Sequence, residues 1–157
     1  MAVALFAGSI VVVLALLPAL TGRGTETQDR LVAARLPDAV RIELKRLAAT
    51  GLEALAAQAP TLASPPIDGL ALVATRDGGR LNALDYGPSP AHAIAEVEQY
   101  FLVECWKFPE EPWRFESSDS AMALAVRVSW PYRLPSATAP VPQETRHEIW
   151  FPVGINR

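Results

Sequence analysis

The first 22 residues of the chain carry no charged side chain, and the first charge is that of Arg23. The sequence of residues 2–20 is AVALFAGSIVVVLALLPAL, a nearly continuous apolar run. A helix rises ~1.5 Å per residue, so such a run is long enough to cross the ~30 Å hydrocarbon core of a bilayer. A core helix of a soluble protein would normally show a polar face, which this run lacks. We therefore expect a membrane-spanning helix over residues 1–22.

A cleaved signal peptide is the alternative for this run. It fits less well, because no basic residue precedes the run, the run is long, and Ala19-Leu20-Thr21 is a poor cleavage site. The residues expected to line the membrane-spanning or filament-core helix are Leu5, Phe6, Gly8, Ile10, Val12, Leu14, Leu17 and Pro18.

Residues 23–59 predict an amphipathic continuation of the same helix. Leu36, Val40, Leu44, Leu47 and Leu55 fall near one helical stripe. Proline removes a backbone donor and crowds the preceding turn, so bends are expected at Pro18 and Pro37. Prolines follow at positions 60, 65 and 66, so the helix should end by residue 59.

The rest of the chain, residues 60–157, predicts a β-rich head. Segments 69–75 and 80–84 flank Asp77-Gly78-Gly79, a good hairpin turn. Segment 99–108 is a strong strand, residues 122–130 alternate apolar and other side chains, and residues 148–153 form a last strand. The predicted fold is therefore α+β, with one long N-terminal helix packed on a four-stranded antiparallel sheet.

A sheet of this size needs one apolar face covered, and the leucine stripe of the helix is the obvious cover. The residues expected at this helix–sheet contact are Leu44, Leu47, Leu55, Leu124, Val126 and Val128, together with Met122.

Composition and motifs argue against several function classes. The head holds eight Lys and Arg residues against twelve Asp and Glu residues, which argues against nucleic acid as a partner. His92 and His147 lie far apart without metal-ligand spacing, and Cys105 has no histidine close in sequence. We therefore expect no catalytic site, no metal, no cofactor and no small-molecule substrate.

Three features of the sequence can each be interpreted in two ways. Asp77-Gly78-Gly79 with Asp85 is a plain hairpin turn or, less in keeping with its spacing, a calcium loop. Glu110-Glu111 is a solvated acidic corner or a contact to a basic partner. The four tryptophans are divided between the core and a protein-contact patch, and the sequence does not say how.

The arrangement resembles the type IV pilin superfamily, which includes minor pilins and the pseudopilins of type II secretion. Segment 2–20 is similar to the part of a pilin helix that follows its signature glutamate, including a proline in the second half, here Pro18. The helical stretch to residue 59 and the strand ALAVRVSWPY at 123–132 also fit. The chain departs from the family in lacking the glycine-aromatic…glutamate peptidase motif, so either the start lies upstream of Met1 or the chain is a degenerate relative.

The resemblance implies a non-enzymatic, pilin-like minor subunit of a type IV pilus or type II secretion-like filament. It implies an inner-membrane, single-pass location with the head in the periplasm or outside the cell. The implied partners are other pilin-like subunits, inner-membrane assembly proteins and membrane lipid. The alternative is a single-pass envelope protein with a small α+β protein-binding head that forms no filament.

Overall fold

The computed structural model describes the backbone of residues 2–84 and 93–156, and the side chains of these residues from Thr25 onward. The helices are α1 (Ala2–Leu47) and α2 (Leu52–Gln58), with single 3-10 turns at Ala48–Thr50, Glu96–Glu98 and Gln143–Thr145. The strands are β1 (Leu70–Ala74), β2 (Leu81–Ala83), β3 (Phe101–Lys107), β4 (Ala121–Trp130) and β5 (His147–Asn156). The chain divides into two compact units, residues 1–32 and 33–157. We call the second unit the head.

Helix α1 begins at Ala2 and continues through both Pro18 and Pro37 to Leu47. The sequence predicted one continuous helix to residue 59, and this prediction is wrong, because α1 ends at Leu47. A 3-10 turn follows α1 and is closed by the N–H of Gly51, which donates to the carbonyl oxygen of Ala48 at 2.9 Å. Gly51 has a φ of 124°, a conformation that glycine adopts far more readily than other residues. Gly51 therefore separates α1 from α2.

The prediction of a membrane-spanning half is contradicted. Within the described part of the chain, no helix combines the length and the apolar character needed to cross a bilayer. From Thr25 onward α1 carries a charged residue every few positions, beginning with Glu26, Asp29 and Arg30. The predicted single-pass location in the inner membrane, with the head in the periplasm, depended on this span and is contradicted for the same reason. The residues predicted to line the span belong to helix α1, but the structure describes only their backbone.

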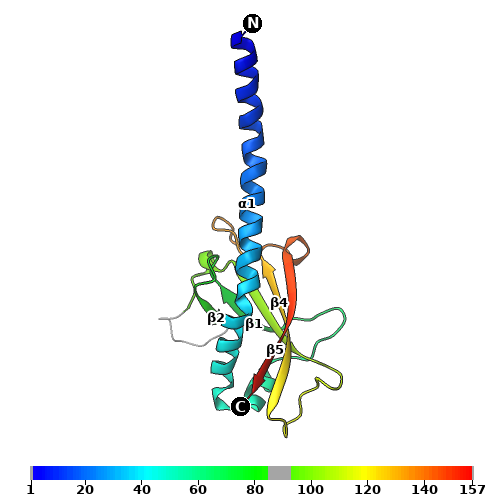
Figure 1. The fold of residues 1–157 in the computed structure, drawn as a ribbon. Helices are drawn as coiled ribbons and strands as arrows, with labels where there is room; N and C mark the ends of the chain where they lie inside the picture. The colour runs from blue at the N-terminus through cyan, green and yellow to red at the C-terminus, as the bar shows by residue number, and fades with distance from the viewer. Residues whose placement is uncertain (1, 85–92, 157) are drawn as a thin grey trace. The chain divides into compact units, whose positions relative to one another are not determined.

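The sheet has five strands in place of the four predicted. All neighbours pair antiparallel in the order β2-β1-β3-β4-β5. The fifth strand arises because the short second arm of the hairpin, β2, pairs with β1 at the edge of the same sheet. The alternating segment 122–130 is confirmed as β4, and the long β4 and β5 run side by side (Figure 1).

One face of the sheet is apolar and buried. Register places Val103 beside Val128 and Cys105 beside Val126, so these side chains share that face. All four are fully buried. Leu36, Val40 and the three predicted helix residues Leu44, Leu47 and Leu55 are buried as well. Because one compact unit holds both sets, we infer that α2 and the last turns of α1 cover this face.

Strand β5 forms one edge of the sheet. All ten of its residues pair with β4, from His147 opposite Trp130 to Asn156 opposite Ala121. Pro152 lies inside β5, opposite Ala125. The strand continues to Asn156, beyond the end at residue 153 that the sequence predicted. Proline is tolerated in a sheet where its missing N–H faces away from the neighbouring strand, so this position fits an edge.

Candidate functional site

Cys105 and His147, the two reactive side chains considered from the sequence that the structure describes, lie in different surroundings. The Cys105 thiol is fully buried on the covered face, and burial, with a smaller contribution from Glu104, raises its pKa far above the usual value. It therefore stays protonated at neutral pH and is a poor nucleophile. His147 is exposed at the start of β5, with its ring 5.8 Å from that of Trp130. His92 lies outside the described residues.

No group of three histidine, cysteine or acidic side chains in the described part of the chain is arranged to hold a metal ion. Asp85, one of the two acids of the calcium interpretation, lies outside the described residues. Asp77 is engaged in the hairpin turn instead.

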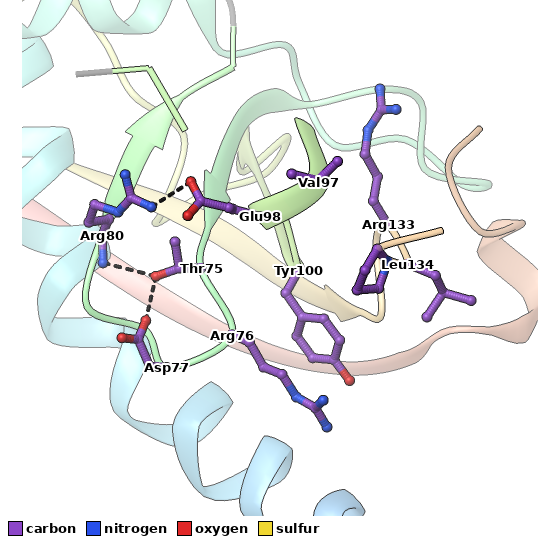
Figure 2. A pocket seen from close by; sticks show the side chains of 10 residues that line it. Thr75, Arg76, Asp77, Arg80, Val97, Glu98, Tyr100, Arg133 and Leu134 are labelled. Carbon is purple, nitrogen blue, oxygen red and sulfur yellow. Dashed lines mark hydrogen bonds and ion pairs between the residues drawn. The ribbon is translucent and has the colours of Figure 1, made fainter. Parts of the chain in front are cut away.

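A pocket of about 550 Å³ lies at one end of the sheet of the head (Figure 2). We call it the arginine pocket. Its lining residues are Thr75, Arg76, Asp77, Arg80, Val97, Glu98, Tyr100, Arg133, Leu134 and Pro135. Of these residues, only Asp77 was considered from the sequence, for a hairpin turn or a calcium loop.

Antiparallel pairing brings these distant segments together. Ala74 at the end of β1 lies opposite Phe101 at the start of β3, so the β1–β2 turn adjoins Tyr100. Strand β4 ends beside the start of β3, and the Tyr132 N–H donates to the Tyr100 carbonyl oxygen at 2.7 Å. Arg133 and Leu134 therefore reach the same end of the sheet. A reading of strand order from the predicted segments could have grouped Arg76, Arg80 and Arg133.

The floor of the pocket is set by the predicted hairpin turn, which the structure confirms. Gly78 adopts a φ of 69° and its N–H donates to the Thr75 carbonyl oxygen at 2.8 Å. The Asp77 carboxylate accepts hydrogen bonds from the Thr75 hydroxyl and the Gly79 N–H. These bonds, the Thr75 bond first, lower the pKa of Asp77, so the carboxylate is ionised and serves to fix the turn.

The arginines of the pocket differ in exposure: the Arg80 side chain is 52% exposed, whereas that of Arg133 is only 15% exposed. Arg80 Nη2 lies 2.6 Å from Glu98 Oε2, and both side chains are about half exposed. Arg133 Nη1 lies 2.9 Å from Oε2 of Glu96, whose side chain is 73% exposed. The guanidinium of Arg76 lies 4.7 Å from the centre of the Tyr100 ring. Exposed ion pairs contribute about 0–1 kcal/mol, so another acidic group can replace a partner at low cost.

Two apolar side chains stand among these charges. Val97 is 61% exposed and Leu134 is 44% exposed, and both line the pocket. Figure 2 shows Val97 next to Glu98 and Leu134 on the side of Arg133. Exposed apolar side chains framed by arginines and a tyrosine are typical of protein-contact surfaces.

The other end of the sheet carries an acidic and aromatic loop, residues 108–120, which we call the β3–β4 loop. It holds Glu110, Glu111, Glu116 and Asp119 against a single arginine, Arg114. Trp113 is 59% exposed, and its ring lies 6.3 Å from that of Phe108. Arg114 bridges Glu111 at 3.2 Å and Glu116 at 3.0 Å. The acidic corner noted in the sequence is thus part of an exposed loop that also presents a tryptophan.

The four tryptophans divide between core and surface. Trp106 and Trp130 are buried, whereas Trp113 and Trp150 are exposed. Trp150 stacks on Trp106 with ring centres 5.4 Å apart. This division was left open by the sequence.

A buried ion pair lies beneath Trp150 on the second face of the sheet. Arg127 donates to Glu104 Oε2 at 2.7 Å and 3.1 Å, and both side chains are almost completely buried. The Arg127 guanidinium also lies 5.1 Å from the Trp106 ring and 5.4 Å from the Trp150 ring. The sequence analysis did not identify this pair, because only the pairing of β3 with β4 places Glu104 opposite Arg127. Its enclosure suits a structural role.

The residues predicted at the helix–sheet contact are buried. Leu44, Leu55, Leu124, Val126 and Val128 are completely buried, and Leu47 is 9% exposed. Met122 is also buried. They therefore belong to the core of the head and not to an exposed site.

Comparisons with family models, with curated proteins and with solved structures find no match for this chain. The resemblance to pilins and to the pseudopilins of type II secretion therefore gains no support from a known family. Function has to be argued from the chain's own surfaces.

Proposed function

We propose that this chain is a pilin-like, non-enzymatic subunit that assembles with other subunits through protein–protein contacts. The observation that carries the proposal is the placement of the charge-free segment. Residues 2–22 belong to helix α1, and residues 1–32 form a compact unit separate from the head. A charge-free helical segment needs apolar cover, and the same segment of neighbouring subunits would provide it.

The small residues of this segment suit such packing. Gly8, Ser9 and the alanines of residues 2–20 permit close approach of helix backbones. A role in protein contacts is also supported by the head, because Trp113, Val97 and Leu134 are exposed on its surface.

The proposal is tested by site-specific crosslinking of the full chain in the cells that produce it. A photoreactive amino acid in place of Val12 should crosslink to residues 2–20 of another subunit, identified by mass spectrometry of the joined peptides. The matched control is the same amino acid in place of Gln28, an exposed position farther along α1. It should give far less of this crosslink.

A protein-binding head that forms no filament is the second candidate, and it predicts a different result. Crosslinks would then form from head positions only, with none between the apolar segments of two subunits. That outcome would refute the filament proposal.

A further inference from the structure

The head carries two surfaces of opposite character at opposite ends of one strand. Tyr100 of the arginine pocket directly precedes β3, and Phe108 of the β3–β4 loop directly follows it. Strand β3 has seven residues, so the two surfaces are separated by about 23 Å at ~3.3 Å per residue. One copy of the head therefore cannot bring its own loop into its own pocket.

The charges of the two surfaces are complementary. The pocket lining has three arginines and two carboxylates, Asp77 and Glu98, and Asp77 is already held by the turn. The β3–β4 loop has four acidic residues and one arginine. Residues 60–157 hold twelve acidic residues against eight basic ones, and the pocket gathers three of those eight basic residues. An acidic loop would be drawn to this end of the sheet and repelled from most of the remaining surface.

The apolar groups are complementary as well. The loop presents Trp113, more than half exposed, between Glu111 and Arg114. The pocket presents Val97 and Leu134 beside the Tyr100 ring, with a volume of about 550 Å³. A tryptophan anchored in a pocket rimmed by arginines and a tyrosine is the composition that dominates binding energy at protein interfaces.

We propose that the β3–β4 loop of one copy docks in the arginine pocket of a second copy, with Trp113 as the anchor. Glu110 and Glu111 of the loop face Arg76 and Arg80 of the pocket, and the exposed pair of Arg80 with Glu98 gives way to the intermolecular pair. The contact joins two different surfaces, so a docked pair keeps a vacant pocket on one copy and a vacant loop on the other. Such a head-to-tail contact repeats from copy to copy.

This inference rests on the proposed filament function, to which it adds the contact between heads. It also gives the head contact a salt dependence that helix packing does not have, because exposed charges are screened at high ionic strength. The two contacts can therefore be separated by experiment.

The test places a photoreactive amino acid at Trp113 of the full chain and mixes isotopically light and heavy copies. The expected products join residue 113 of one copy to residues 76–80 or 133–135 of the other, with a yield that falls as salt is raised. The control is the same amino acid at Trp150, another exposed tryptophan, which should not reach the pocket.

Charge reversal sharpens the result. Glu110→Arg with Glu111→Arg should lower the yield of the residue 113 crosslink about tenfold, as should Arg76→Glu with Arg80→Glu. Combining all four substitutions should restore most of the yield. Urea unfolding of each variant shows that the head is intact.

Three outcomes overturn the inference: no crosslink from residue 113, crosslinks to other parts of the head, or crosslinks that neither reversal changes. If residue 12 still crosslinks between subunits in these cases, the filament proposal stands and only the docking contact is refuted. If residue 12 gives no crosslink while residue 113 does, the heads associate without a filament core, and the proposed function fails instead.

Discussion

Gly69 occupies a position where the structure leaves no room for a side chain, and Gly69→Ala therefore tests the packing of the central strand. A Cβ at Gly69 would lie 2.9 Å from Cε2 of Trp106 and 3.0 Å from the backbone N and O of Cys105. Favourable carbon contacts lie at about 3.5–4.0 Å. Strand β3 is paired on both sides, by β1 and by β4, so it cannot easily retreat.

Three effects set the size of the change. Overpacking of a close-packed site costs about 1–3 kcal/mol. A shift of the Trp106 ring would also strain the hydrogen bond that its Nε1–H donates to the Ile67 carbonyl oxygen at 2.8 Å, a bond worth about 1 kcal/mol. Against these, alanine restricts the unfolded chain and returns about 0.4–1 kcal/mol. We expect Gly69→Ala to lower the free energy of unfolding by about 2 kcal/mol.

The measurement is urea unfolding of the full chain, followed by tryptophan fluorescence. The matched control is Gly154→Ala in β5, where an added Cβ would meet no atom within 4 Å. It should change the free energy of unfolding by less than about 0.5 kcal/mol. Equal unfolding midpoints for the two variants would show that the region around Gly69 is loosely packed and that the reasoning is wrong. Adding Trp106→Phe to Gly69→Ala should not restore full stability, because the contacts with the Cys105 backbone remain.

Three further changes test the core, the buried ion pair and the turn. Val126→Ala should destabilise the head by ~1–3 kcal/mol in urea unfolding, because Val126 is completely buried, whereas Val97→Ala at a mostly exposed valine should cost under ~0.5 kcal/mol; similar losses would contradict the assigned core. Glu104→Leu should cost about 3–5 kcal/mol by leaving the buried Arg127 with only the half-exposed Glu148 carboxylate, 4.0 Å away, and adding Arg127→Met should recover most of the loss; no recovery would argue against the pairing. The lowered pKa of Asp77 stabilises the fold above the unfolded pKa of about 4, and this contribution is lost as pH falls through the folded pKa. The difference in free energy of unfolding between the unchanged chain and Asp77→Asn should therefore shrink from pH 6 to pH 3. A difference independent of pH would show that the Asp77 carboxylate does not stabilise the turn.

Local sequence signals located individual strands, although the predicted number of strands was wrong. Alternation identified β4 because one of its faces is buried, and glycine at positions 78 and 79 identified the hairpin. The helix break was missed for a physical reason. Leu47, Leu52 and Leu55 are all buried, so the apolar stripe continues across the break and conceals Gly51.

The arginine pocket was missed because it depends on topology. Its residues come from the β1–β2 turn, from the turn before β3 and from the segment after β4, which are separated by up to about sixty positions in the chain. No local periodicity links Arg76 with Arg133. Strand order and direction bring them together, and the sequence analysis had not assigned that order. The Glu104–Arg127 pair was missed for the same reason.

Pro152 decides how the open edge of the sheet can be used. Backbone groups of alternate residues point away from the sheet, so Glu148, Trp150, Gly154 and Asn156 share the outward direction of Pro152. A strand arriving from another molecule would find hydrogen-bond donors near both ends of β5 and none at its middle. Continuous strand-to-strand pairing, the route by which exposed sheets grow into amyloid-like aggregates, is therefore interrupted at its centre. At high local concentration of the protein, the missing N–H of Pro152 therefore hinders aggregation through the β5 edge.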